Sequence, residues 1–254
     1  MIYDIQPASI LKRISAFILD IILLATVAVG VMFATAKIVD VDTHQDKLQE
    51  KYDYYEETYN VKFDLTQEEV DAMSEEEKAH YEEVEAILQS DEELIKEYNL
   101  VINLTLVVVF VGLLIAVLIL EFVLPIIFKN GQTVGKKVFS LCVVKNNSVR
   151  MTNVQLFVRT IFGKFIIELL IPAYVIVALV FGQLGRIWLF FLIALAILQL
   201  ILLIATKHHT VIHDAISFSV VCDKQTQKIF ASEQELIKYK EKVHSEEVAK
   251  THTY

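Results

Sequence analysis

Helix-breaking residues are scarce in this chain, which has 3 prolines and 7 glycines among 254 residues. Because both residue types interrupt regular structure, their scarcity lets apolar stretches continue as long helices, and we expect an all-α protein. Cysteine is also scarce, with only Cys142 and Cys222 present. Two cysteines argue against a disulfide scaffold, and the topology derived below puts both in the cytoplasm, where thiols stay reduced.

Acidic residues are missing from residues 122–167, a stretch that contains seven bases. The acids are concentrated instead in residues 37–99, which hold 21 acids and 6 bases and carry a net charge of −15. Because the whole chain has a net charge of −9, the remainder carries +6. This division is typical of a membrane protein with an acidic segment on one side, and it gives no support to nucleic-acid binding.

Apolar residues make up 55% of the chain, and the mean hydropathy is +0.49. A soluble domain of this size could not bury so much apolar surface, so the protein's solvent must include lipid. Four runs are long enough to cross a bilayer, and we expect transmembrane helices over residues 8–36, 100–128, 154–181 and 187–206. The first run could also be a cleavable signal peptide, but it is longer than the usual hydrophobic region of a signal peptide and contains Asp20.

The distribution of positive charge predicts the orientation of these spans. By the positive-inside rule, the basic linker at residues 129–153 lies in the cytoplasm. The acidic segment at residues 37–99 then lies outside, and the tail at residues 207–254 returns to the cytoplasm. We therefore expect a multi-pass protein of the cell membrane with cytoplasmic N- and C-termini.

The acidic segment carries sequence signals for helix starts. Thr66, Ser74 and Ser90 are each followed three residues later by glutamate, as in a capping box, and Ser232 begins the same pattern in the tail. We therefore expect a helical extracytoplasmic insertion and a short helix in the tail. The carboxylates of the insertion favour a solvated face, with calcium or a basic protein partner as alternatives, although no calcium-loop spacing is present.

Each predicted span carries one polar side chain at a similar distance from its cytoplasmic end. These side chains are Asp20, Glu121, Glu168 and Gln199, each about 10–14 Å inside the membrane at helical rise. A charged group at this depth costs a few kcal/mol unless it is paired, protonated or wetted, so each acid needs a partner. If the four face one another, they form a buried polar layer in the inner leaflet.

Two interpretations of this layer remain open. In the structural one, Arg13, Arg159 and Lys164 neutralise the acids and fix helix register, with Lys164 and Glu168 already at i,i+4 spacing. In the functional one, the acids bind a cation or relay protons, because burial brings proton and cation binding into competition near neutral pH. Both interpretations predict inward-facing carboxylates.

A histidine cluster follows the fourth span. His209 and His213 have the i,i+4 spacing of a two-histidine metal site, with His208 and Asp214 beside them. No third ligand is evident nearby, so we expect a structural role, no metal site and no cofactor. Asp214 can close onto Arg13, which would form a cytoplasmic latch.

Three segments together resemble the RDD family of integral membrane proteins. They are LKRISAFILD at residues 11–20, NGQTVGKKV at residues 130–138 and HD at residues 213–214. The resemblance implies that Arg13, Asp20 and Asp214 are the arginine and two aspartates that name the family. It also implies a role in transport, and a sodium/proton antiport activity has been proposed for some members. The remaining motif residues are Gly131, Gln132, Thr133, Gly135, Lys136 and His213.

The GQTVGK string differs from a phosphate-binding loop. A Walker loop has four residues between its glycines and a Ser or Thr after its lysine, whereas here three residues intervene and Lys137 follows Lys136. We expect instead a turn that starts a basic amphipathic helix against anionic lipid. The apolar side of that helix would consist of Val134, Val138 and Leu141.

These observations lead to two functional expectations. The first is a small transporter in which Asp20, Glu121, Glu168 and Gln199 handle monovalent cations or protons. The alternative is a non-transporting scaffold or accessory subunit that recruits a basic partner through residues 37–99. Four helices enclose little space, so a homo-oligomer is also expected. We do not expect an enzyme, because no nucleophile with a base and no complete metal motif is recognisable.

Overall fold

The computed structural model describes residues 5–251, and the chain divides into two compact units. The first contains the chain up to Val31 together with everything from Gly112 onward, and the second is Met32–Val111. Four of the described helical stretches are long and apolar enough to span a membrane: Ile10–Ile38, Glu92–Ile127, Asn153–Val180 and Trp188–Ala205. The prediction of an all-α polytopic membrane protein is therefore confirmed.

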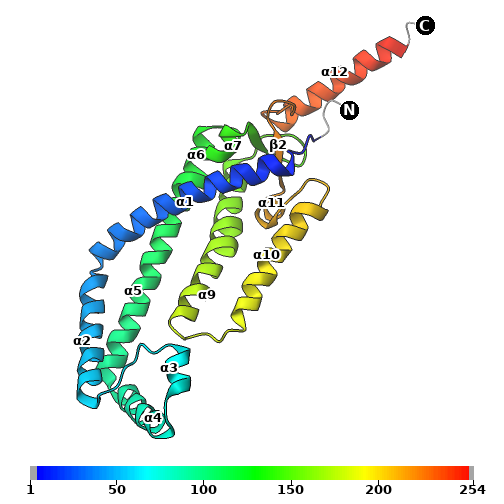
Figure 1. The fold of residues 1–254 in the computed structure, drawn as a ribbon. Helices are drawn as coiled ribbons and strands as arrows, with labels where there is room; N and C mark the ends of the chain where they lie inside the picture. The colour runs from blue at the N-terminus through cyan, green and yellow to red at the C-terminus, as the bar shows by residue number, and fades with distance from the viewer. Residues whose placement is uncertain (1–4, 252–254) are drawn as a thin grey trace. The chain divides into compact units, whose positions relative to one another are not determined.

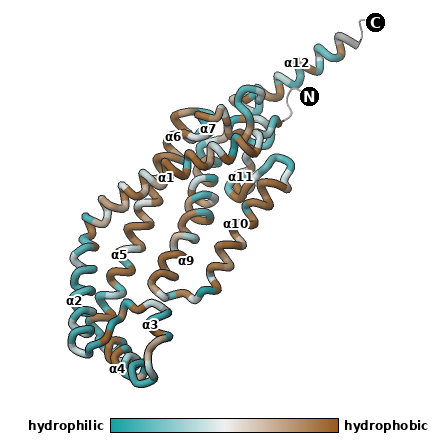
Figure 2. The backbone as a smooth tube through the Cα atoms, viewed as in Figure 1, coloured by the Kyte–Doolittle hydropathy of each residue, from teal (hydrophilic) through white to brown (hydrophobic). Residues whose placement is uncertain are grey.

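The four stretches are built from several helical elements (Figure 1). Helix α1 (Ile10–Ile38) forms the first alone, and α10 (Trp188–Ala205) forms the fourth. The second runs through α5 (Glu92–Val117), the π-helix η1 (Leu118–Val123) and α6 (Leu124–Ile127). The third runs through α8 (Asn153–Val158), the π-helix η2 (Arg159–Leu170) and α9 (Ile171–Val180). Helices α1, α5, α9 and α10 are mainly hydrophobic (Figure 2).

A small antiparallel sheet in the first unit was not predicted from the sequence. Strand β1 (Leu141–Lys145) pairs with β2 (Ser219–Asp223), and Cys142 lies directly opposite Cys222. Both cysteines are free and buried. Because burial in the sheet raises the pKa of each thiol to about 12, neither is a ready nucleophile.

Short helices flank the sheet. Helix α7 (Val134–Val138) precedes β1, α11 (Ile212–Ile216) precedes β2, and α12 (Glu233–Thr251) follows them. The prediction of one amphipathic helix extending to Leu141 was wrong, because Leu141 starts β1 and is completely buried in the sheet. Two consecutive valines favour a strand there, and five residues are too few to show a helical period.

The second unit has a core of its own. Helices α2 (Val41–Tyr59), α3 (Gln67–Ala72) and α4 (Glu75–Ser90) lead into the start of α5. Val84, Leu88 and Leu94 form the centre of this core, with tyrosine and phenylalanine side chains of α2 and its following loop around them. The acidic segment is therefore folded rather than an extended linker.

The predicted helix starts in this unit are mostly correct. Thr66 and Ser74 form complete capping boxes with Glu69 and Glu77. The prediction for Ser90 was wrong by one residue, because Asp91 Oδ1 accepts the amide hydrogen bonds of residues 93 and 94. Aspartate is as good a cap as serine, so both positions satisfied the sequence rule.

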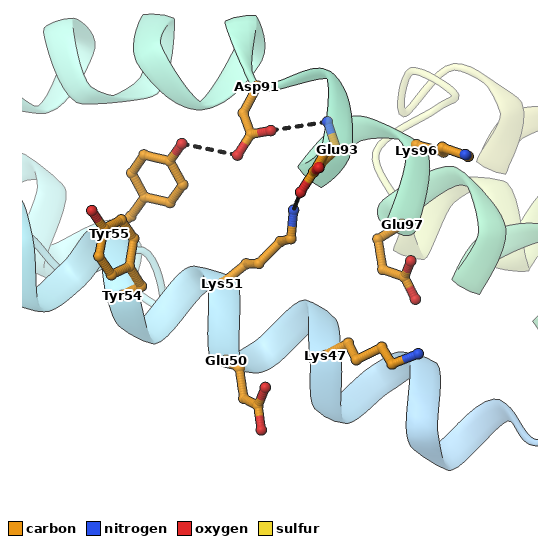
Figure 3. A pocket seen from close by; sticks show the side chains of 9 residues that line it. All are labelled: Lys47, Glu50, Lys51, Tyr54, Tyr55, Asp91, Glu93, Lys96 and Glu97. Carbon is orange, nitrogen blue, oxygen red and sulfur yellow. Dashed lines mark hydrogen bonds and ion pairs between the residues drawn. The ribbon is translucent and has the colours of Figure 1, made fainter.

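An open hollow of about 570 Å³ lies between α2 and the start of α5. Figure 3 shows Lys51 and Tyr55 of α2 reaching across it. Lys51 Nζ lies 3.1 Å from Glu93 Oε2, and the Tyr55 hydroxyl donates to Asp91 Oδ2 at 2.9 Å. These two contacts hold α2 against the segment that enters the second span.

Candidate functional site

Asp20, on α1, is held by the NGQTVGKKV segment. The Gly135 amide donates to Asp20 Oδ1 at 2.7 Å, and the Thr133 hydroxyl donates to Oδ2. Lys136 Nζ lies 3.6 Å from the same Oδ2 and donates to Thr133 Oγ1 at 3.2 Å. The motif therefore folds inward onto α1 with Lys136 buried, and the prediction that it lies against lipid headgroups was wrong for these residues.

Gly135 makes this approach possible. A Cβ atom at this position would lie 2.2 Å from the Ala16 carbonyl oxygen and 2.9 Å from Asp20 Cγ. Both distances are far below van der Waals contact, so any larger residue must push α7 away from α1. Glycine is therefore required where the backbone amide binds the carboxylate.

We expect Gly135→Ala to lower the thermal unfolding midpoint of the detergent-purified protein by several degrees, because the clash separates α7 from α1 and breaks the amide bond to Asp20. Gly30→Ala, on the same helix as Asp20, is the matched control, since a Cβ there meets nothing within 4 Å. That substitution should leave the midpoint unchanged or raise it slightly. Equal midpoints for the two variants would show that the close approach is not required.

Glu121, in η1, is buried and pairs with Lys164 of η2, whose Nζ lies 2.6 Å from Glu121 Oε1. Among the described residues, its second oxygen, Oε2, has no hydrogen-bond partner. The i,i+4 spacing of Lys164 and Glu168 does not produce an ion pair between them in the described structure, and both residues lie in the π-helix η2. Its wider turn changes which side chains share a face.

Lys136 links the two carboxylates electrostatically. Burial lowers the pKa of its ammonium to about 8, and the neighbouring cations Lys164 and Arg159 lower it further against the opposing effect of Glu121 and Asp20. A lysine in this state loses its proton close to physiological pH. The sequence singled out Lys136 only as part of a motif and gave no signal of its burial.

Asp214, in α11, is completely buried between two arginines. Arg13 Nη2 donates to Asp214 Oδ2 at 2.9 Å, and Arg159 Nη2 donates to Oδ1 at 2.8 Å. Although burial opposes it, the adjacent His213, Arg159 and Arg13 hold the pKa of Asp214 well below its usual value. The structure thus brings together Arg13 and Asp214, whereas Arg159 binds Asp214 rather than an acid of the predicted layer.

Glu168 and Gln199 meet in the first unit. Gln199 Nε2 donates to Glu168 Oε1 at 2.6 Å, and His213 Nδ1 donates to the same oxygen at 2.7 Å. Burial lowers the pKa of His213, against the opposing effect of the Glu168 and Asp214 carboxylates that its ring faces. Gly163 allows this contact, because a Cβ there would lie 2.5 Å from His213 Cβ.

The other two histidines of the predicted cluster, His208 and His209, are not part of these contacts. His209 Nδ1 lies 2.9 Å from the Leu203 carbonyl oxygen, a hydrogen bond that closes the turn after α10. His208 Nδ1 is buried and has no partner among the described residues. In the part of the chain that the structure describes, no three side chains of histidine, cysteine, aspartate or glutamate are grouped to hold a metal ion.

The predicted layer thus consists of two connected groups. One contains Asp20 and Glu121, joined through Lys136, and the other contains Glu168 and Gln199, joined to α11 through His213. Arg159 bridges them electrostatically, because it influences Lys136 in the first and His213 in the second. Every acid of the two groups has a basic or amide partner.

Comparison with known proteins finds one family. Residues 7–217 match the model of the RDD family. No curated protein and no solved structure matches the chain.

Proposed function

Because this chain belongs to the RDD family of multi-pass membrane proteins, we propose that it is a small carrier that exchanges a monovalent cation for a proton at the Asp20–Lys136–Glu121 group. The observation that carries this proposal is the buried Lys136, which lies 3.6 Å from Asp20 and interacts electrostatically with Glu121, whose Oε2 has no hydrogen-bond partner among the described residues. Oxygen atoms of this kind are what a sodium or potassium ion binds. The chain is proposed as a carrier and not as an enzyme.

The balance of charges in the site couples cation binding to proton release. Four carboxylates, of which Asp20, Glu121 and Asp214 are buried and Glu168 is partly buried, are matched by four bases, of which Arg13, Lys136 and Arg159 are buried and Lys164 is partly buried. The formal charges of these eight side chains sum to zero. A cation that enters leaves one positive charge uncompensated, which is costly in a region of low dielectric constant. Lys136 restores neutrality when it releases its proton to water, so one cation enters as one proton leaves.

We further propose that the protein lies in the cell membrane with both termini in the cytoplasm. The positive-inside rule supports this orientation, since the seven bases of residues 122–167 are opposed by no acid. The acidic segment at residues 37–99 then lies outside. A proton released from Lys136 would therefore leave toward the cytoplasm, because its motif belongs to the cytoplasmic linker.

Vesicles containing the protein should acidify or alkalinise when a sodium or potassium gradient is imposed. The expected result is a change of internal pH, followed with a trapped indicator dye, that exceeds that of protein-free vesicles and reverses with the gradient. Choline chloride serves as the control for osmotic effects. PH traces equal to those of empty vesicles for both cations between pH 6 and 9 would reject exchange.

Stability should depend on pH through Lys136. Its ammonium loses the proton near pH 8 when folded and near pH 10.5 when exposed, so the unfolded chain binds more protons between these values. The free energy of unfolding therefore rises with pH in this window, by an amount on the order of 3 kcal/mol. The Lys136→Gln variant should lack this rise in the free energy of unfolding. Unfolding midpoints of the wild type and the variant, measured between pH 7 and 10, test the prediction. Parallel pH profiles for the two would contradict the assignment.

A second candidate function rests on the second unit. Its own core and capped helices make it a folded module with 21 acids and 6 bases in residues 37–99, which suits a basic protein partner. In that case the chain is an accessory subunit. Deletion of residues 40–95 should then abolish co-purification of the partner, and unchanged co-purification would count against this role.

A further inference from the structure

A second hollow, of about 200 Å³, lies in the first unit where the second span ends and the third begins. Pro125, Ile126 and Leu156 contribute its apolar part, and Lys129 and Arg150 contribute its charge. Because the spans Glu92–Ile127 and Asn153–Val180 both terminate here, the hollow lies at one membrane surface. That is the level of lipid headgroups.

The two basic side chains of this hollow do not pair with other side chains of the described structure. Neither side chain has an ion pair or hydrogen bond among the described residues, and both are exposed. Other bases near the same surface are engaged: Lys12 pairs with Asp223, Lys145 with Glu233, and Lys137 lies over the Phe128 ring. Residues 122–167 contain no acid, and the acids from elsewhere that pair with other bases of this stretch do not pair with Lys129 or Arg150 in the described structure.

Apolar side chains continue from the hollow along the membrane-facing surface. Ile127 is 61% exposed, Val154 is 72% exposed and Phe157 is 43% exposed, and all belong to the same two span ends. An acyl chain can pack against these side chains while its phosphate reaches the two cations. A free phosphate ion could use only the charged part of the site.

We propose that this hollow binds the phosphate group of an anionic phospholipid, held between Lys129 and Arg150 with its acyl chains along α6 and α8. Basic hollows between span ends recognise anionic headgroups because the charges are complementary. The site is separate from the Asp20–Lys136–Glu121 group and does not depend on exchange.

Native mass spectrometry of the full-length protein can test this proposal by counting phosphatidylglycerol and phosphatidylcholine molecules retained from equal mixtures. Wild type should retain phosphatidylglycerol preferentially. The double variant Lys129→Gln/Arg150→Gln should lower that preference at least about fivefold, whereas the charge-preserving Lys129→Arg/Arg150→Lys keeps it. The control Lys207→Gln/Lys238→Gln removes the same charge elsewhere and should keep the preference.

The lipid site would be overturned by an unchanged preference in the glutamine double variant, by an equal loss in the control, or by displacement of the lipid by millimolar inorganic phosphate. The last outcome would identify a general phosphate site instead. Loss of the preference in the charge-preserving variant would likewise contradict binding through charge. Unfolding midpoints of all variants distinguish loss of lipid from loss of fold.

Discussion

Asp20→Asn is expected to reduce cation-driven pH change in vesicles to the level of empty vesicles. Asparagine keeps the size of the side chain and can still accept the Gly135 amide bond, but it removes the charge that faces Lys136. A cation would then meet only neutral oxygens at this position, and Lys136 would have one fewer carboxylate to favour its charged form. This one substitution therefore weakens cation binding at position 20 and also makes the charged form of Lys136 less favourable.

Asp46→Asn is the matched control for this experiment. Asp46 is exposed on α2 in the second unit, so the same chemical change there should leave the pH trace at the wild-type amplitude. An Asp20→Asn protein that is folded and retains half or more of the wild-type rate would show that Asp20 does not bind the transported ion.

Asp214→Asn is expected to destabilise the protein by about 3–5 kcal/mol, because it leaves the guanidinium groups of Arg13 and Arg159 buried without a carboxylate. Most of this cost is the desolvation of two unpaired charges rather than the loss of attraction. The variant should show a much lower unfolding midpoint, or too little folded protein to purify.

The control for Asp214 is Asp223→Asn, which removes a carboxylate from a partly exposed pair with Lys12. Pairs of this kind contribute about 0–1 kcal/mol, so its midpoint should stay within a few degrees of wild type. Similar midpoints for the two variants would contradict the assignment of Asp214 as the centre of a buried network.

The architecture of the spans was predictable because hydropathy reports directly on contact with lipid. Uninterrupted apolar runs fixed the four spans, and short capping patterns fixed the helix starts at Thr66 and Ser74. The polar positions were also recognisable, because Asp20 and Glu121 stand out against apolar neighbours. These are local signals that need no knowledge of tertiary contacts.

The partners of these acids were not predictable in the same way. Lys136 lies more than one hundred residues from Asp20, and its burial depends on the close approach that Gly135 allows. Lys164 pairs with Glu121 because two π-helical segments change the spacing of side chains along the spans. Neither a glycine contact nor a π-turn has a strong signature in one sequence.

The two strands were missed for a related reason. Residues 141–145 and 219–223 are short apolar runs, and periodicity alone does not separate such a strand from part of a buried helix. Their pairing joins the linker between the second and third spans to the segment after the fourth span. Through this sheet, β1 follows the motif that holds Asp20, and β2 follows the helix that carries Asp214.

Proton release on cation binding is the most direct test of exchange at the Asp20–Lys136–Glu121 group. Sodium or potassium chloride is added to purified protein in weakly buffered detergent at pH 7.5, with choline chloride as the control, and the released protons are counted with an indicator dye. The proposal predicts close to one proton per bound cation in the wild type and none in Lys136→Gln. Calorimetric binding of the cation without proton release, or equal release in the Lys136→Gln variant, would contradict it.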